Sequence, residues 1–382
     1  MLDAATIETI ERLFAVPKDA WDALANPADQ PYDPFISWDF LEALEASKSV
    51  RAETGWQPQH VLLKRGDALV GAMPAYLKGH SQGEYIFDHA FADAYQRAGG
   101  RYYPKFLSAV PFTPATGRRL LAAAEEDRQL LASGAAEVAR QMGLSGASIN
   151  FLTADEIETI SDSGYVLRYG EQYHFEDRGY GDWDGFLAAL ASRKRKALRK
   201  EREAIARSGL TIEWVSGPDI EERHLDAFWW FYQDTGARKW GTPYLTRTFF
   251  TLIAERMPER LLFIFARRGD DMIAGALNFI GGETLFGRYW GCKEHVPFLH
   301  FELCYYQAID YAFAHGLRRV EAGAQGEHKI ARGYEPVPIR SAHRMTDPNF
   351  QAAIADYLER EREHIEADIE LLKGITPFKK GE

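Results

Sequence analysis

Residues 65–77 read RGDALVGAMPAYL, and residues 268–280 read RGDDMIAGALNFI. Each stretch is a charged Gly–Asp turn followed by an apolar strand, and the two align without a gap. An apolar strand precedes each turn, and a helix and a further strand follow at a distance. Charged hairpin turns are common enough for chance to produce one match, but the shared order of elements favours a tandem duplication of one α/β unit.

The order of predicted elements indicates an α/β (α+β) fold with two similar domains. Runs of strand–strand–strand–helix–strand fit mixed, mostly antiparallel sheets flanked by helices, whereas the alternating β–α–β runs of a doubly wound sheet are missing. We expect a helical or irregular lead-in over residues 1–33, a first domain over 34–160 and a second over 161–346. Apolar residues at helical spacing predict a C-terminal amphipathic helix and tail over 347–382, lying on the body of the protein.

The composition is that of a folded, acidic protein. Of 382 residues, 46% are hydrophobic and 13% aromatic, and the net charge of −11 argues against a protein that coats nucleic acid, so we expect no DNA partner. Cys292 and Cys304 fit neither a disulfide framework nor a Cys-based zinc site, and the histidines show no metal spacing, so we expect no metal. With no signal-peptide pattern and no apolar run of about 20 residues, we expect a cytoplasmic protein.

The densest group of polar residues belongs to a predicted strand–helix–strand unit over residues 286–334. The first strand ends in RYWGC (288–292), a buried helix runs from about 299 to 314, and Val320 opens a short strand. A polar loop follows it, with Glu321, Gln325, Glu327, His328, Lys329 and Arg332. Loops of this kind at strand ends are usual small-molecule sites in α/β folds. A solvated turn whose charges pair with one another is the alternative.

Several long stretches resemble one protein family. They are WQPQHVLL, YLKGHSQGEYIFDHAFADAYQRAGGRYYPK, VPFTPATGRRLL, SRKRKALRKERE, KWGTPYLTRTFF, GRYWGCKEHVPFLHFELCYYQAIDYA and EAGAQGEHKIARGYEPVPIRSAH. The resemblance, from about residue 34 to 378, is to the FemAB-like "peptidoglycan biosynthesis/recognition" proteins of the GNAT-type N-acyltransferase superfamily. It implies two GNAT-like domains and transfer of an acyl or aminoacyl group to an amine, in peptidoglycan precursor modification. A non-catalytic GNAT-fold protein that recognises a peptidoglycan precursor, a nucleotide or RNA is the alternative.

Acyl transfer to an amine needs a proton acceptor and stabilisation of an oxyanion. Glu321 is the first candidate base, because it ends a strand; an acidic residue at a similar strand end in FemAB relatives resembles it. Glu327 and His328 are the alternative bases, His328 because the ordinary pKa of histidine lies near neutrality, and Gln325 is placed to donate to the oxyanion. Lys329 and Arg332 suit a phosphate or a carboxylate of the substrate. Surface ion pairing would produce the same pattern.

Two further groups are candidates for substrate binding. Lys239, Trp240 and Tyr244 belong to a loop that combines a cation with two aromatic rings, suited to stacking on a base, a sugar or a peptide. A packed turn with Trp240 at its centre is the alternative. Arg288 and Trp290 are two residues apart on a strand and are expected to point to the same side.

Two stretches of the sequence, a loop and a helix, indicate which acyl donor the protein uses. The residues after the 288–292 strand, KEHVPFLHF, lack the glycines that hold the pyrophosphate of CoA in the GNAT enzymes that the chain resembles. Of the two implied donors, acyl-CoA and aminoacyl-tRNA, this favours the second. Residues 192–207 carry eight Lys or Arg and two Glu, a basic helix suited to tRNA, nucleotide phosphates or lipid head groups, or simply a solvated face. The predicted polyanion-binding residues are Arg193, Lys194, Arg195, Lys196, Arg199 and Lys200.

Overall fold

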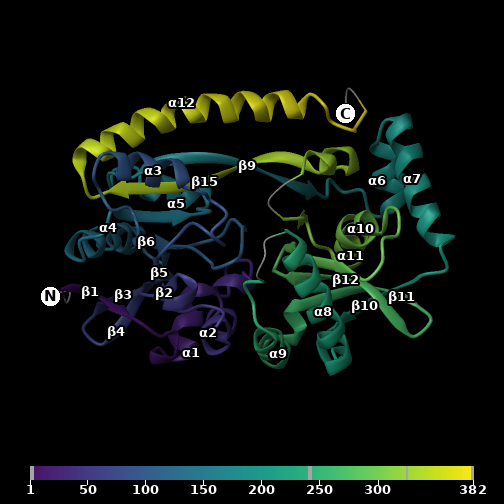
Figure 1. The fold of residues 1–382 in the computed structure, drawn as a ribbon, viewed down its shortest axis with the longest axis horizontal. Coiled ribbons are helices and arrows are strands. Elements are labelled where there is room, and N and C mark those ends of the chain that lie inside the picture. The colour runs from purple at the N-terminus through teal and green to yellow at the C-terminus, as the bar shows by residue number, and fades with distance from the viewer. Residues whose placement is uncertain (1–3, 240–242, 324–325, 380–382) are drawn as a thin grey trace. The chain divides into compact units, whose positions relative to one another are not determined.

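The computed structural model describes residues 4–239, 243–323 and 326–379 (Figure 1). The chain forms two compact units: unit 1 comprises Met1–Glu171 and Pro338–Ala367, and unit 2 comprises Gln172–Val337 and Asp368–Glu382. These units do not follow the boundaries predicted at residues 160 and 346, because three elements contribute residues to both units. They are β9 (Val166–Glu176), β15 (Glu335–Met345) and α12 (Pro348–Lys373).

Unit 1 contains two sheets. The first has the order β1-β3-β4-β7 and is antiparallel throughout. The second has the order β15-β8-β6-β5-β2, in which only the β6–β8 pair is parallel. The strands are β1 (Ala5–Ile10), β2 (Trp56–Pro58), β3 (His60–Arg65), β4 (Ala68–Met73), β5 (Ala75–Lys78), β6 (Lys105–Ser108), β7 (Leu121–Ala122) and β8 (Gly146–Asn150). The helices are α1 (Lys18–Ala25), α2 (Trp38–Ala46), α3 (His89–Arg97), α4 (Glu125–Gln141) and α5 (Ala154–Thr159).

Strand β1 corrects the expectation of a helical or irregular lead-in. It pairs with β3 along its whole length, from Ala5 opposite Arg65 to Ile10 opposite His60. Its sequence is ATIETI, and four of these six residues are β-branched. Such residues favour the extended backbone of a strand, so the local sequence and the pairing agree.

Unit 2 contains one sheet of order β10-β11-β12-β13-β14-β9, in which only the β13–β14 pair is parallel. Its other strands are β10 (Thr211–Ser216), β11 (Leu261–Arg268), β12 (Asp271–Ile280), β13 (Thr284–Cys292) and β14 (Arg319–Glu321). The helices are α6 (Trp183–Ala189), α7 (Ser192–Ala206), α8 (Glu222–Lys239), α9 (Arg247–Arg256), α10 (Leu299–Phe301) and α11 (Gln307–His315). A π-helical turn, Glu302–Tyr306, joins α10 to α11, so the helix expected over 299–314 is present with a local irregularity.

The internal repeat is confirmed by the register of the two RGD hairpins. In β3–β4, Arg65 lies opposite Ala68, and a bulge interrupts the pairing between Leu63 and Lys64. In β11–β12, every pair and the bulge recur 203 positions later, since Arg268 lies opposite Asp271. Gly66 and Gly269 both adopt a positive φ, 58° and 61°, at the turn. The duplicated sequence therefore encodes the same hairpin twice.

The two copies differ where unit 1 carries Pro74. The position 203 residues later is Leu277, inside the continuous strand β12. Proline has no N–H to donate to a sheet and is tolerated at strand ends. Accordingly, the chain is divided at Pro74 into β4 and β5, which belong to different sheets of unit 1.

Each unit packs one face of its sheet on a helix. In unit 1, Phe106, Ala147 and Ile149 belong to the core that includes residues of α4. In unit 2, Leu285 and Val320 belong to the core that includes residues of α11. Successive side chains of a strand alternate between its faces, so the residues between these point to the opposite face. The candidate sites lie on that face.

Candidate active site

Glu321 is the last residue of β14, where the pairing between two parallel strands ends. It pairs with Phe286 of β13 on one side and with His174 of β9 on the other. Strand β13 continues beyond this point to Cys292, alongside β12. Glu321 is buried, with 6% of its surface exposed. Its carboxylate is therefore carried by a strand that is hydrogen-bonded on both sides, and not by a loop.

His174 is a neighbour of Glu321 that the sequence analysis missed. Its Nε2 atom lies 3.8 Å from Glu321 Oε1 and donates to Gln172 Oε1 at 3.3 Å. Burial, together with the positive charges of Arg319 and Lys329, lowers the pKa of His174 to about 3. The imidazole is therefore neutral at physiological pH, and 3.8 Å is too long for a hydrogen bond. Glu321 thus has a neutral neighbour, not a cationic one, on this side.

Lys329 is a buried amine in the loop that follows β14. It belongs to a 3₁₀ helix, Glu327–Arg332, and is 1% exposed. Its Nζ donates to the carbonyl of Gly323 at 2.8 Å and lies 5.9 Å from the ring centre of Tyr173. Burial lowers the pKa of Lys329 to about 7, so both protonation states are populated near neutral pH. Its charge also acts on His174, which is the neighbour of Glu321 on β9.

His328 and Arg332 are engaged by other side chains. His328 Nε2 lies 2.9 Å from the hydroxyl of Tyr305, and burial lowers the pKa of His328, with a further contribution from Arg332. Arg332 donates to both carboxylate oxygens of Glu201 at 3.0 Å and lies 3.4 Å from the ring centre of Phe301. These contacts tie the loop to α7, and the substrate-binding role predicted for Arg332 stays a prediction.

A bulge in β13 corrects the expected common orientation of Arg288 and Trp290. The β12–β13 register shifts so that Arg288 is an extra residue, and strict alternation does not hold through it. The guanidinium of Arg288 lies 5.5 Å from the ring centre of Tyr289, which packs on Tyr232 of α8. The ring of Trp290 packs on His300 at 5.1 Å. The two candidate side chains therefore lie in different surroundings.

Other candidates fall at the edges of the described chain. Trp240 and Gln325 lie outside the described residues, and Lys239 is the last residue of α8. The backbone of Tyr244 is held by the hydroxyl of Tyr232, which accepts its N–H at 3.1 Å. The roles predicted for these residues stay predictions.

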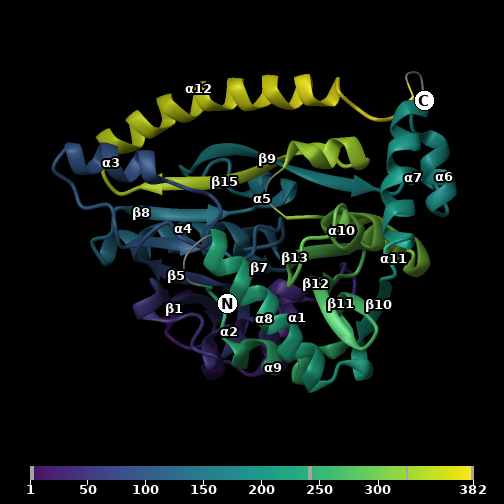
Figure 2. The same ribbon diagram turned by 45° about the vertical axis from the view of Figure 1, so that its right-hand side comes forward.

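All six predicted polyanion-binding residues lie on α7, which runs beside α6 (Figure 1 and Figure 2). The helix buries Leu198 and Ile205. Arg193, Lys196, Arg199 and Lys200 are exposed, and Lys194 and Arg195 are half-buried. Burial of the apolar positions thus turns the cationic side of the helix outward.

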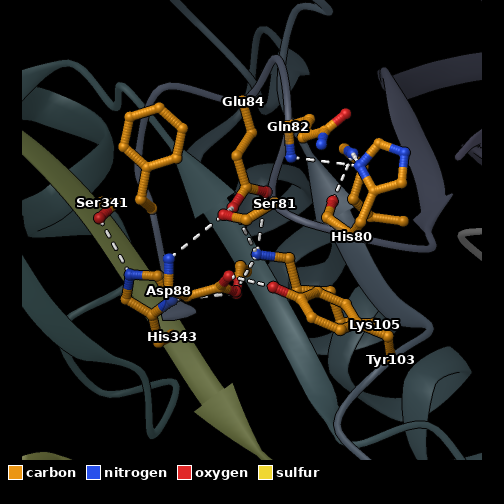
Figure 3. Close-up of polar contacts among 12 residues, drawn as sticks. His80, Ser81, Gln82, Glu84, Asp88, Tyr103, Lys105, Ser341 and His343 are labelled. Carbon is orange, nitrogen blue, oxygen red and sulfur yellow. Dashed lines mark hydrogen bonds and ion pairs between the residues drawn. The ribbon is translucent and has the colours of Figure 1, made fainter. Parts of the chain in front are cut away.

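Unit 1 contains a buried ionic network that the sequence analysis did not single out (Figure 3). Lys105 of β6 lies at its centre, where its Nζ donates to Glu84 Oε1 at 3.1 Å and pairs with Asp88. Asp88 also accepts hydrogen bonds from the hydroxyls of Tyr102 at 2.7 Å and Tyr103 at 2.6 Å. Lys105, Glu84 and Asp88 are each no more than 2% exposed. The network is therefore a closed interior cluster.

The pKa values of the two carboxyl groups in this network are shifted in opposite directions. Burial raises the pKa of both carboxyl groups, and Lys105 opposes it. At Asp88, Lys105 and the two tyrosine hydroxyls prevail and hold the pKa well below its usual range. At Glu84 burial prevails, and the pKa is raised to about 7. Lys105 itself has a raised pKa, because Asp88 and Glu84 outweigh its burial. The network thus holds a permanent ion pair and one carboxyl that titrates near neutrality.

A second buried lysine lies across the strands from the first. Lys78 of β5 is paired with Lys105 of β6, so the two side chains share one face of the sheet. Lys78 is fully buried, lies 4.4 Å from the ring centre of Trp56, and donates to the carbonyl of His80. Burial, opposed by Glu84 and supported by the charge of Lys105, lowers the pKa of Lys78 to about 7.

His343 of β15 lies on the same polar face (Figure 3). Its Nδ1 atom is 3.0 Å from Ser148 Oγ, and its Nε2 atom is 2.9 Å from Ser341 Oγ. All three residues are no more than 2% exposed, and burial lowers the pKa of His343 to about 3. These polar groups satisfy one another inside unit 1, which marks them as structural.

One signal in the sequence pointed to this cluster. Lys78 ends an apolar strand and Lys105 begins another, and a buried lysine requires a carboxylate partner. The segment between them, GEYIFDH, supplies Glu84 and Asp88. The pairing of these groups depends on strand register, which the local sequence does not reveal.

Comparison with known proteins gives the family. A family model for FemAB-like proteins, described as peptidoglycan biosynthesis/recognition, matches residues 12–380. The chain belongs to the FemAB-like family. No match was found among curated proteins.

Three solved structures are similar to this FemAB-like chain. FemX is 13% identical, with 90% of this chain and 99% of FemX covered and a TM-score of 0.55. The C-terminal domain of a putative lysylphosphatidylglycerol synthetase from Agrobacterium fabrum is 11% identical, with 90% and 95% covered and a TM-score of 0.54. L-PGS from Bacillus licheniformis is 10% identical, with 87% and 99% covered and a TM-score of 0.51. At these identities the likeness concerns the fold alone.

The described part of this FemAB-like chain contains neither a group of metal-binding side chains nor a membrane-spanning helix. Within residues 4–239, 243–323 and 326–379, no three His, Cys, Asp or Glu side chains are grouped as a metal site requires. Over the same residues, no helix is both long enough and apolar enough to cross a membrane.

Proposed function

We propose that this FemAB-like chain is an N-acyltransferase that transfers an aminoacyl group to an amine at the end of β14. One observation carries the proposal. The buried carboxylate of Glu321 ends β14 beside the neutral imidazole of His174, and the charge of the buried amine of Lys329 acts on that imidazole. His174 and Lys329 both have lowered pKa values, and ionisable groups of altered pKa near a buried carboxylate are typical of catalytic sites.

In the proposed reaction, the acceptor amine attacks the carbonyl carbon of an aminoacyl ester. A C–N bond forms, the C–O bond of the ester breaks, and the leaving oxygen takes up a proton. Glu321 accepts the proton that the amine loses, and neutral His174 beside it does not hold the carboxylate in a salt bridge. Protonated Lys329 stabilises the negative charge that develops on the carbonyl oxygen.

An aminoacyl ester of tRNA is the donor that we favour over acyl-CoA. The loop after β13, residues 293–298, contains no glycine and includes Glu294, which does not suit a pyrophosphate. The family description supports a peptidoglycan precursor as the acceptor. The name of one neighbour of similar fold, a putative lysylphosphatidylglycerol synthetase, is consistent with transfer of an amino acid.

The test is turnover by the full-length protein with a panel of charged tRNAs and acyl-CoA donors and with peptidoglycan precursors as acceptors. Glu321→Gln is expected to lower kcat about 10²- to 10⁴-fold, because it removes the proton acceptor. Glu327→Gln is the matched control, since Glu327 is exposed in the same loop, and it is expected to keep wild-type activity. Equal rates for wild type and Glu321→Gln would eliminate Glu321 as the base.

The pH dependence of kcat tests the role of Lys329. Lys329 acts in its protonated form, so kcat is expected to fall as the pH rises through about 7. Lys329→Arg keeps the charge at high pH and is expected to remove this fall. If no donor is turned over but a precursor raises the melting temperature, the chain is a binding protein and the proposed reaction is wrong.

A further inference from the structure

Helix α7 carries a concentration of positive charge that is at odds with the charge of the whole chain. Residues 192–200, SRKRKALRK, contain no acidic residue, whereas the chain has a net charge of −11. We call the six basic residues of this stretch the α7 cations: Arg193, Lys194, Arg195, Lys196, Arg199 and Lys200. None of them is buried.

The described residues of unit 2 do not neutralise these charges. Later in the same helix, Arg202 is paired with Glu302 at 3.1 Å and Asp310 at 2.6 Å. Among the α7 cations, Arg199 alone has a carboxylate of the described residues within 4 Å, that of Asp184 at 3.9 Å, and both side chains are largely exposed. An ion pair this exposed contributes little stabilising free energy. The charge of the α7 cations is therefore available to a partner.

Two exposed aliphatic side chains belong to the C-terminal segment, which packs beside the start of α7. Leu371 is 68% exposed and Ile375 is 56% exposed, more than any other large apolar side chain described in unit 2. The segment is attached by backbone hydrogen bonds of 2.9 Å from Ala191 to Pro377 and 3.1 Å from Lys379 to Ala189. Both views show it ending beside α6 and α7 (Figure 1 and Figure 2). Exposed cations and protruding aliphatic groups thus occur on neighbouring segments of one unit.

The chemistry of this combination distinguishes two classes of polyanion. Single-stranded nucleic acids are bound by cations together with aromatic rings that stack on the bases. The aromatic rings near α7 are already engaged, since Phe378 stacks on Tyr180 and Trp183 carries the guanidinium of Arg202. The exposed groups are aliphatic, and aliphatic groups beside cations suit the boundary between anionic lipid head groups and acyl chains.

We propose that the α7 cations, with Leu371 and Ile375, form a docking surface for an anionic lipid bilayer. The cations lie against the head groups, and the two aliphatic side chains enter the acyl boundary. This is a peripheral attachment and involves no spanning segment. It is independent of the proposed transferase, because none of these residues belongs to the Glu321 site.

The experiment is sedimentation of the full-length protein with vesicles. Vesicles of phosphatidylcholine alone are compared with vesicles in which about a third of the lipid is phosphatidylglycerol. We expect binding to the anionic vesicles only. Each cation near an anionic surface contributes about fivefold in affinity. The combined variant Arg193→Gln, Lys194→Gln, Arg195→Gln and Lys196→Gln is therefore expected to bind about 600-fold more weakly. Leu371→Ser with Ile375→Ser is expected to bind about tenfold more weakly.

A matched variant controls for net charge. Arg223→Gln, Arg268→Gln, Lys293→Gln and Arg318→Gln remove the same charge from exposed sites of unit 2 outside α7 and are expected to bind as wild type. Equal loss in this control would overturn the surface, because binding would then follow net charge alone. An unchanged affinity of the Leu371 and Ile375 variant would overturn the lipid assignment, as would tighter binding to single-stranded or transfer RNA than to anionic vesicles.

Discussion

Unit 1 and unit 2 place a histidine beside the same strand position and give that position different chemistry. Ser148 in unit 1 and Glu321 in unit 2 each pair with a parallel strand on one side and with a histidine of an antiparallel strand on the other. The histidines, His343 and His174, both have a pKa lowered to about 3 by burial. The duplicated backbone thus preserves the place of a polar pair, while the side chain beside the histidine, Ser148 in one unit and Glu321 in the other, decides whether that position can accept a proton.

The two buried lysines of unit 1 also differ from the residues at the equivalent positions of unit 2. By strand register, Lys78 and Lys105 correspond to Gly281 and Thr284 in unit 2. Unit 1 therefore fills its polar face with charges that neutralise one another, and unit 2 has small uncharged residues there. The difference teaches that one framework serves as a closed ionic core in one copy and as a candidate reaction site in the other.

The largest effect that tests this comparison is expected at Lys105. Lys105→Met leaves the buried carboxyl groups of Glu84 and Asp88 without their cation, and is expected to lower the free energy of unfolding by about 3–5 kcal/mol. The measurement is equilibrium denaturation by urea. Lys64→Met, which removes a partly exposed pair with Glu8, is the control and is expected to cost no more than about 1 kcal/mol. A similar small loss for Lys105→Met would mean that the network is not a structural core.

A smaller effect is expected at the two histidines. Because each is neutral in the folded chain down to about pH 3, whereas an unfolded histidine takes up a proton near pH 6.5, the unfolded state binds more protons between these values. The free energy of unfolding therefore falls as the pH is lowered through this range. His174→Gln and His343→Gln are each expected to reduce that slope by about 1.4 kcal/mol per pH unit, measured between about pH 5.5 and 4, where an unfolded histidine is almost fully protonated. An unchanged slope in one variant would break the equivalence of the two sites.

The smallest effect is expected at the two hairpin turns. Gly66 and Gly269 have φ values of 58° and 61°, which strain any residue with a Cβ atom. Gly66→Ala and Gly269→Ala are each expected to lower the free energy of unfolding by about 1 kcal/mol. Thermal unfolding of the two variants and the wild type measures this loss of stability. Effects that differ more than twofold would show that the two hairpins, identical in register, are not equivalent in energy.

Much of the fold was accessible from the sequence because it depends on local patterns. The RGD turns and the apolar strands beside them predicted a repeat, and the register of both hairpins confirmed it. The placement of Glu321 at a strand end was also a local inference. The boundaries of the units were not accessible, because β9, β15 and α12 contribute to both, and long-range pairing has no local signature.

The site was predicted only in part, for the same reason. His174 lies 147 positions before Glu321 and meets it only through the pairing of β9 with β14. The bulge at Arg288 and the contacts of Arg332 with Glu201 likewise depend on partners distant in the chain. A pattern of polar residues shows which groups a loop carries, but not which of them are already engaged.

By itself, the sequence determined the duplicated hairpin, the mixed strand–helix order, the basic character of α7 and the carboxylate at the end of β14. These follow from residues close together in the chain, where turn geometry and hydrophobic periodicity act. Only the tertiary structure decided that Lys105 is buried against Glu84 and Asp88, that His174 is neutral beside Glu321, and that the α7 cations lack internal partners among the described residues, apart from the exposed Arg199–Asp184 contact. Burial and charge pairing are properties of neighbours in space, and strand register sets those neighbours.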